Sequence, residues 1–250
     1  MTRWKASAIH LAISITIALI TLTLMLALWY APPFFSAAGG REVLMIMLGV
    51  DVTLGPLITL LVFNPDKKLN LLRFDLTIIA LLQLSALIYG VNVMFHSRPA
   101  FVVYSKGSFD LVLASDLSDA DLAKAKDPIF STLSLTGPIY TYTEMPKDAK
   151  EQSDVVFAAF SGKDLPFFPQ YYQELSLHLA ELVSASKSLS ELKKYNPYRV
   201  SELENMIAER KWSDDEVGYL PLRSKFGAIA IVINRQSGKV IGGLDMEPWQ

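Results

Sequence analysis

The sequence contains no cysteine, so it forms no disulfide, no thiolate metal site and no cysteine nucleophile. Its only three histidines are scattered. His10 and His96 fall near opposite ends of apolar stretches, and His178 stands alone on a predicted amphipathic helix. Because a metal site needs several such ligands together, the sequence predicts no metal ion and no cofactor.

Motifs of common enzymes are also absent. There is no G-x-S-x-G, no P-loop and no G-x-G-x-x-G in the chain. The acidic run Asp214-Asp215-Glu216 is typical of a solvated loop. A formal net charge of −2 gives no general attraction to nucleic acid. We therefore expect a protein that is not an enzyme and has no nucleic-acid partner.

Long apolar segments dominate the first 95 positions. A membrane-spanning helix needs about 20 mainly apolar residues, and three segments satisfy this: Ile9–Tyr30, Val43–Phe63 and Leu76–Phe95. The first is longer than the apolar part of a signal peptide, and two more follow it, which disfavours a cleaved leader. The sequence predicts a three-span membrane domain over residues 1–97.

Charges beside these segments predict their orientation. Arg3 and Lys5 precede the first span, and the loop at 64–73 carries Lys67, Lys68 and Arg73. By the positive-inside rule both regions are cytoplasmic, in a multi-pass protein of a bacterial inner membrane. Three crossings then put residues 98–250 in the periplasm.

The part after residue 97 has the pattern of an α+β domain. Two β-hairpins are predicted at its ends, over 101–114 and 228–244, with a further strand at 139–143. Helices are predicted at 147–160, 170–186, 189–195 and 200–211, and a short one begins after Ser118. The terminal hairpins are expected to share one sheet, because an isolated hairpin is barely stable.

Asp51 is the one ionisable residue well inside a span, where a charge costs at least about 2.5–3.5 kcal/mol. At ~1.5 Å per residue it lies roughly 12 Å below the outer end of its segment, which makes Thr21 and Ser85 its candidate partners by depth. Gly49 and Gly55 would permit close helix approach, and Pro56 should kink the helix. Two interpretations stay open: a residue that fixes helix packing, or a contact for a partner.

Two chemical roles for Asp51 are disfavoured. An intramembrane aspartyl protease needs two facing carboxylates, but the spans offer one, and Leu48-Gly49-Val50 departs from the Gly-x-Gly-Asp pattern. A transporter would need several polar groups along a path. In the second domain, four aromatic residues lie close to Pro166 and Pro169. They form either core or an exposed anchor for a partner: Phe167, Phe168, Tyr171 and Tyr172.

Short motifs lie along most of the chain. They are Tyr30–Phe35 with Gly39-Gly40, Gly49–Leu57, Phe63–Lys68 and Leu72–Leu76 with Leu82-Gln83-Leu84, followed by Arg98-Pro99, Gly137-Pro138, Tyr219–Arg223, Ser237–Val240 and Pro248-Trp249. In these motifs the sequence resembles the TfpX/TfpZ family of type IV pilin accessory proteins. The resemblance implies an inner-membrane protein that assists type IV pilus (fimbrium) biogenesis and has no established active site.

This leads to a chaperone-like function as a hypothesis. Pilins rest in the membrane on a hydrophobic helix with a globular head outside, and this chain has the same two-part organisation. We expect it to bind the type IV major pilin and to modulate its assembly. The alternative is a structural or regulatory subunit of the pilus assembly platform that does not touch pilin. The pilin type, the oligomeric state and the direction of the effect on pili stay open.

Overall fold

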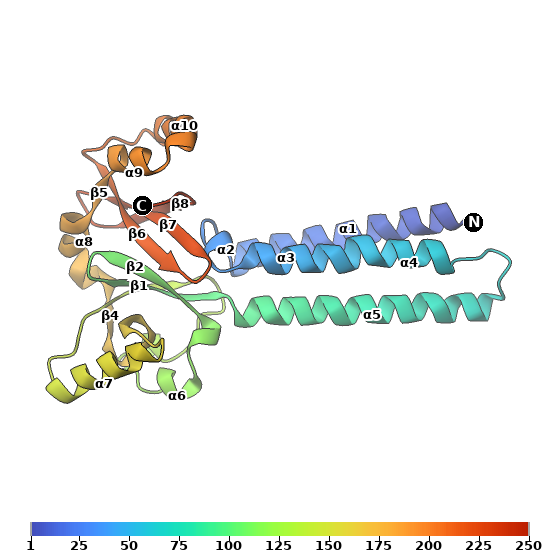
Figure 1. Cartoon of the computed structure of the whole chain (residues 1–250), viewed down its shortest axis with the longest axis horizontal. Coiled ribbons are helices and arrows are strands. Elements are labelled where there is room, and N and C mark those ends of the chain that lie inside the picture. Colours follow the sequence, from blue (N-terminus) through green and yellow to red (C-terminus); the bar gives the residue numbers. More distant parts are fainter. Residues whose placement is uncertain (1, 250) are drawn as a thin grey trace. The chain divides into compact units, whose positions relative to one another are not determined.

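The computed structural model describes residues 2–249 and divides into two compact units (Figure 1). The helical unit comprises the chain up to Trp29 and Gly39–Ser97. The sheet unit comprises Tyr30–Ala38 and the chain from Arg98 onward. The boundary after residue 97 coincides with the one expected from the sequence. The short segment Tyr30–Ala38, called here the first-loop segment, departs from that expectation because it belongs to the sheet unit.

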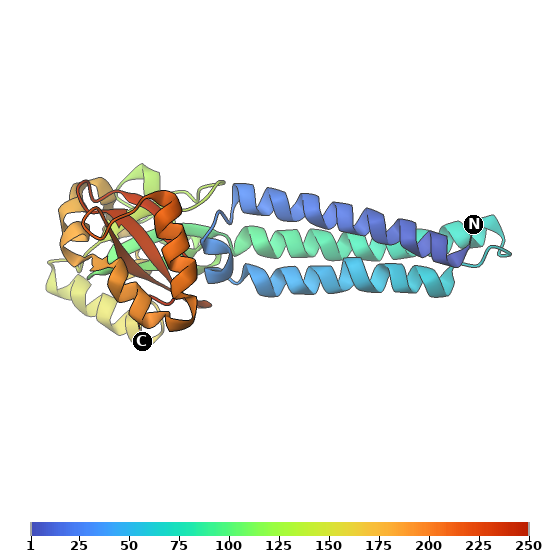
Figure 2. The same cartoon turned by 90° about the horizontal axis from the view of Figure 1, so that it is seen from above.

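The described part of the helical unit contains three long helices (Figure 2). They are α1 (Arg3–Leu28), a second helix made of α3 (Gly40–Leu48), a π-helical turn (Gly49–Leu54) and α4 (Gly55–Val62), and α5 (Leu69–His96). Each is long and apolar enough to cross a membrane. Most large apolar side chains on them face outward, as expected when the solvent is hydrocarbon.

Pro56 accounts for the irregular second helix. Proline has no backbone N–H and cannot continue the usual ladder. Just before it, the Gly55 N–H donates to Val50 O, five residues back, which is the π-helical register. The next bond in this register would run from residue 56 to Asp51 O, and Pro56 cannot form it. The backbone carbonyl of Asp51 therefore needs a donor from elsewhere.

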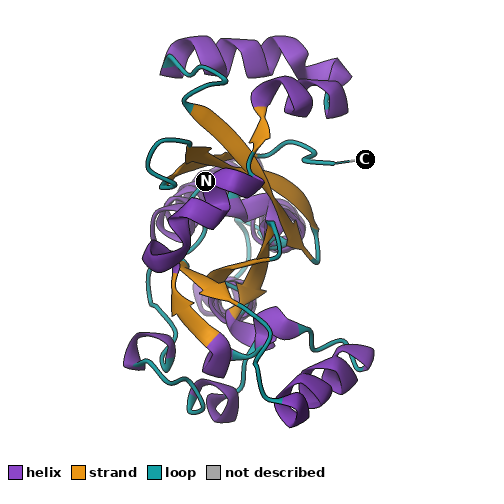
Figure 3. Ribbon diagram, turned by 90° about the vertical axis from the view of Figure 1, so that its left-hand side faces the viewer, coloured by secondary structure: helices purple, strands orange, loops and turns teal. Residues whose placement is uncertain are grey.

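The sheet unit is built on one curled mixed sheet, flanked by helices (Figure 3). The strands are β1 (Pro99–Ser105), β2 (Ser108–Leu113), β3 (Ile139–Thr143), β4 (Tyr172–Glu174), β5 (Lys187–Ser188), β6 (Val217–Ser224), β7 (Gly227–Asn234) and β8 (Val240–Leu244). The helices are α2 (Phe34–Ala37), α6 (Asp119–Leu122), α7 (Ala149–Phe160), α8 (Leu179–Ala185), α9 (Leu189–Tyr195) and α10 (Val200–Arg210). Among the described residues, short 3₁₀ turns lie between them at 114–116, 128–130, 165–167, 169–171, 175–178 and 197–199.

The strand order is β4-β3-β1-β2-β6-β7-β8, with β5 paired to β6. β1 pairs parallel with β3, and β2 pairs parallel with β6, while the other pairs are antiparallel. Both predicted hairpins are present, and they lie in the same sheet, as expected. The first turns at Lys106 and Gly107, whose φ angles of 50° and 83° suit a two-residue hairpin.

Two apolar clusters stabilise this sheet. One packs β1 and β2 against α6 and neighbouring turns, around Phe101 and Phe130. The other packs β6, β7 and β8 against α9 and α10, around Leu192 and Val232. Figure 1 shows these two groups of helices at opposite ends of the sheet. The β-rich part of the molecule therefore has the apolar interior of a protein that folds in water.

Two features differ from the sequence-based prediction. The predicted helix at 170–186 is wrong in its first half, where Tyr172–Glu174 form β4 and helix α8 begins only at Leu179. Pairing of these residues with β3 overrides their helical pattern. Strand β6 is an addition to the prediction, and it contains Pro221. This proline lies between the residues that pair with β5 and those that pair with β2, so its missing N–H interrupts neither pairing.

The first-loop segment contributes to the core of the sheet unit. Tyr30, Phe34 and Ala37 are buried. The Phe34 ring lies 6.4 Å from that of Tyr140, and Ser36 Oγ donates to Asp245 Oδ2 at 2.9 Å. The first-loop segment, which lies between the first and second long helices, is therefore part of the sheet unit. The other residues of that unit come after the third long helix.

Candidate functional site

Asp51 lies in the π-helical turn, at the midpoint of the apolar segment Gly40–Val62. Its side-chain oxygen Oδ1 is buried and has no hydrogen-bond partner among the described residues. In hydrocarbon an unsatisfied carboxyl group is costly, because no water is available to replace the missing bond. Asp51 is therefore the feature of the helical unit that packing alone does not explain.

A chain of side-chain hydrogen bonds crosses the helical unit beside Asp51. Gln83 Nε2 on α5 donates to Asp51 O at 3.0 Å, which satisfies the carbonyl that Pro56 leaves without a donor. Gln83 Oε1 lies 2.7 Å from His10 Nε2 on α1, and His10 Nδ1 lies 2.6 Å from Thr59 Oγ1 on α4. This polar network links all three long helices.

Small residues make room for the network. A Cβ on Gly55 would lie 2.1 Å from Gln83 Nε2, so only glycine permits this approach. A Cβ added to Gly49, in contrast, would meet no atom of a neighbouring helix within 4 Å in the described structure. Ser7 Oγ donates to Pro56 O at 2.9 Å and adds a further contact between α1 and α4. Of the two glycines singled out in the sequence, Gly55 is the one at a helix contact.

Neither residue expected as a partner of Asp51 forms a hydrogen bond with its Oδ1 in the described structure. Ser85 Oγ donates to Leu81 O, 2.8 Å away on its own helix. Thr21 and Asp51 line one small cavity of about 10 Å³, yet Asp51 Oδ1 finds no partner within residues 2–249. Sequence reasoning did not connect Gln83 or His10 with Asp51. The signal that points to Gln83 is Pro56, which predicts a carbonyl in need of a donor.

A recess opens between α1 and α5, with Asp51 at its base. Its volume is about 180 Å³. α1 packs on α4 and on the π-helical turn, and α5 packs on the second helix along its length. Ile13 and Ile17 line the recess from α1, and Leu84 lines it from α5. These side chains are 54%, 43% and 52% exposed, so the recess is open at the surface of the helical unit.

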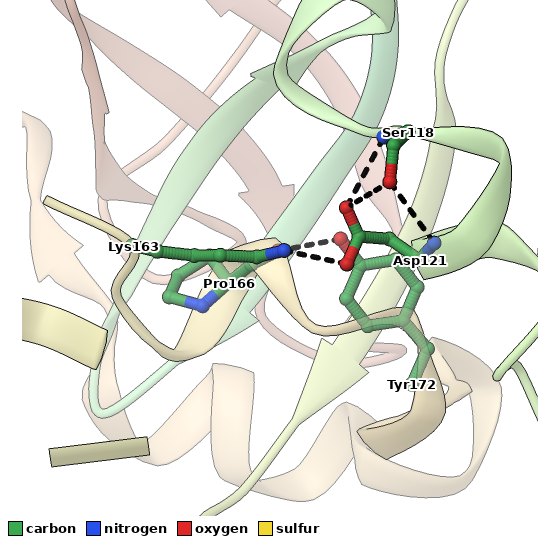
Figure 4. Close-up of polar contacts among 5 residues, drawn as sticks. All are labelled: Ser118, Asp121, Lys163, Pro166 and Tyr172. Atoms are coloured by element: carbon green, nitrogen blue, oxygen red, sulfur yellow. Dashed lines mark hydrogen bonds and ion pairs between the residues drawn. The ribbon is translucent and has the colours of Figure 1, made fainter. Parts of the chain in front are cut away.

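The aromatic cluster of the sheet unit is mainly packed. Tyr172 is buried, and its hydroxyl donates to Pro166 O at 2.5 Å (Figure 4). Phe167 packs against the core around Phe101. The Phe168 ring lies 5.2 Å from Lys163 Nζ, and Tyr171 is half-buried beside it. The cluster therefore contributes more to the core than to an exposed anchor.

Exposed aromatic side chains occur instead on α7. Phe157 and Phe160 are 69% and 84% exposed, and Val156 beside them is also exposed. On this helix, which is described in full, Val155 is the buried residue. We call Val156, Phe157 and Phe160 the α7 patch. The sequence signal for it is an apolar arc in 147–160 that is wider than one buried helix face requires.

Charged residues near this region serve the fold. Lys163 Nζ pairs with Asp121 Oδ1 at 2.5 Å, and the Asp121 carboxylate also accepts from Ser118, which caps α6 (Figure 4). Burial alone would raise the pKa of Asp121, but the bonds from Lys163 and Ser118 outweigh it and lower the pKa to about 2. Within residues 2–249, no group of three or more His, Asp or Glu side chains is placed to hold a metal ion.

Known fimbrial assembly proteins are similar to this chain. A family model described as fimbrial assembly protein FimB matches residues 1–39. A fimbrial assembly protein of serogroups C1 and C2 from Dichelobacter nodosus is 33% identical over 121 residues, which covers 48% of this chain and 92% of that protein. The chain belongs to the FimB family of fimbrial assembly proteins.

Two longer relatives match almost the whole chain. Fimbrial assembly proteins of serogroups E1 and I from Dichelobacter nodosus are 27% and 26% identical over 247 residues, covering 98% of this chain and 96% of each relative. No solved structure matches the chain. The match over both units supports a role of the whole chain, rather than of one unit, in type IV fimbrial biogenesis.

Proposed function

We propose that this protein is an inner-membrane accessory protein of the TfpX/TfpZ kind that binds type IV pilin subunits and modulates their assembly. In this proposal the N-terminus is cytoplasmic, the sheet unit is periplasmic, and the protein has no catalytic activity. Membership of the FimB family supports the link to fimbrial assembly. Three apolar helices with basic residues at the start of the first (Arg3 and Lys5) and between the last two (Lys67 and Lys68) support the orientation.

One observation carries the proposal: the chain offers a contact surface in each unit. The helical unit has an open recess with a carboxyl oxygen that lacks a partner among the described residues. The sheet unit has the α7 patch, whose exposed aromatic side chains are typical of protein contact sites. A pilin before assembly also consists of a membrane helix and a head outside the membrane. A protein with contact surfaces in both places could hold a pilin at both levels.

Site-specific photo-crosslinking in living cells tests the proposal. A photoreactive residue at Phe157 or Phe160 should yield adducts with the major pilin. The matched control is Phe226, which is 52% exposed and lies outside α7, in the turn between β6 and β7. Adducts with assembly-platform proteins in place of pilin would favour a structural subunit of the platform and contradict pilin binding.

Orientation requires its own measurement. A reporter that is active only in the periplasm, fused at the C-terminus, should be active, and the same reporter in the loop at 64–68 should be inactive. The opposite pattern would reverse the proposed topology.

A further inference from the structure

We infer that the recess between α1 and α5 is the docking site for the membrane helix of the pilin, and that this helix brings a hydrogen-bond donor to Asp51. This inference rests on the proposed function and names the surface and the chemistry of the contact.

The first argument is the unsatisfied oxygen. Of the polar side chains nearby, Gln83 bonds the Asp51 backbone carbonyl and His10, and His10 also bonds Thr59. Neither these groups nor Ser14, which also lines the recess, bonds Asp51 Oδ1, and across the described chain this oxygen has no partner. Protonation does not solve this, because a neutral carboxyl group in hydrocarbon still has polar atoms to satisfy. The missing partner is a donor from outside this chain.

The second argument is shape. A volume of about 180 Å³ far exceeds the ~10–15 Å³ that a cavity needs to hold one water molecule. It is large enough to receive side chains of another helix. The lining is mainly apolar, with Ile13, Ile17 and Leu84 exposed, and its polar members are His10, Ser14, Gln83 and Asp51 with its unsatisfied oxygen. A mainly apolar helix with one donor at mid-depth complements this arrangement.

The third argument is the way the helices pack. α1 and α5 each pack along the second helix, and the His10–Gln83 hydrogen bond joins them directly at one end of the recess. Beyond this bond, towards Ile17 and Leu87, the recess separates them. A fourth helix seated there would contact α1, the π-helical turn and α5 together. The π-helical turn places Asp51 at the base of this site, a recurrent use of such turns at functional positions.

Photo-crosslinking within the helical unit tests the inference with matched pairs. The probes are Ile17 on α1 and Leu84 on α5, which line the recess. The controls are Ile15 and Leu82, two residues away on the same helices, exposed and about 200° round each helix. The expected result is pilin adducts at Ile17 and Leu84 that exceed those at Ile15 and Leu82 by about tenfold.

Variants at Asp51 test the chemistry. Asp51→Ala should reduce the recess adducts by about tenfold, the effect of losing one hydrogen bond to a charged or strongly polar group. Adducts at Phe157 and Phe160 should persist. Asp51→Asn should restore the recess adducts if the donor is neutral and should not if it is a cation, which identifies the donor class. Because Asp51 Oδ1 has no partner within the described chain, Asp51→Ala should not lower the melting temperature in detergent.

Other outcomes separate the inference from the proposed function. Lipid adducts alone, adducts with a second copy of this chain, or equal pilin adducts at probes and controls would overturn the docking site. If α7-patch adducts with pilin persist in that case, the proposed function stands and only the recess is wrong. Absence of pilin adducts from both units would overturn both.

Discussion

The two units of this protein are organised in opposite ways. In the sheet unit the interior is apolar, with residues such as Val103, Leu220 and Ile231 fully buried. In the helical unit most of the large apolar side chains face outward, and His10, Gln83 and other hydrogen-bonding groups join the helices. A protein in water buries its apolar groups, and a protein in hydrocarbon buries its polar groups. The contrast within one molecule indicates water around one unit and hydrocarbon around the other.

The largest expected effect compares one leucine from each unit. Leu220→Ala removes a fully buried side chain from the sheet unit and should lower the free energy of unfolding by about 2–5 kcal/mol. Leu61→Ala removes a side chain that is 81% exposed in the helical unit and should change stability by less than about 0.5 kcal/mol. Thermal unfolding of the purified chain in detergent, followed by pulse proteolysis, measures both. If the two substitutions lowered the free energy of unfolding equally, the proposed difference between the interiors of the two units would be wrong.

A glycine pair sharpens the comparison inside the helical unit. A Cβ at Gly55 would collide with Gln83 Nε2, and this group cannot move aside without losing its bond to Asp51 O. Gly55→Ala should therefore destabilise the unit by about 1–3 kcal/mol. Gly49→Ala meets open space and should stabilise the helix by roughly 0.5–1 kcal/mol. Melting temperatures of the two variants in detergent should shift in opposite directions.

A further effect concerns pH and the sheet unit alone. Hydrogen bonds from Lys163 and Ser118 hold the pKa of Asp121 at about 2, against an ordinary value of 3.8. A depressed folded-state pKa contributes stability above the ordinary value, and this stability is lost as pH falls from about 4 to about 2. In the Asp121→Asn variant the melting temperature should fall less than in the unmodified protein when the pH is lowered from about 4 to about 2. Asp119→Asn, on the same helix α6, is the matched control, and its melting temperature should fall as much as that of the unmodified protein.

The sequence is sufficient for features with a strong local pattern. Three long apolar helices, both terminal hairpins and the strand at Ile139–Thr143 are predictable because each depends on a run of apolar or β-prone residues. Strand β6 and the short strand β4 escape prediction because their pairing depends on residues far away in sequence. Pro221 disfavours a strand in the sequence. In the structure it is tolerated because it lies between the residues of β6 that pair with β5 and those that pair with β2.

The candidate site shows the same limit. Asp51 is identifiable as a polar residue inside an apolar segment, but the sequence ranks its neighbours by depth alone. Depth does not specify which side of a helix faces its neighbour, so it favours Ser85 and passes over Gln83, two residues away. A serine in a membrane helix commonly bonds the carbonyl four residues earlier, as Ser85 does. The longer Gln83 side chain reaches the neighbouring helix instead.

The first-loop segment has a consequence for the order of events during synthesis. Ser36 and its partner Asp245 are separated by 209 positions. At roughly 5–20 residues per second, ribosomes make the second of these residues about 10–40 seconds after the first. The apolar surfaces of Phe34 and its neighbours therefore stay exposed until the last strands have been synthesised. A prematurely terminated chain would retain the three long helices and leave this early segment uncovered, a difference that quality-control proteases could use to remove incomplete copies.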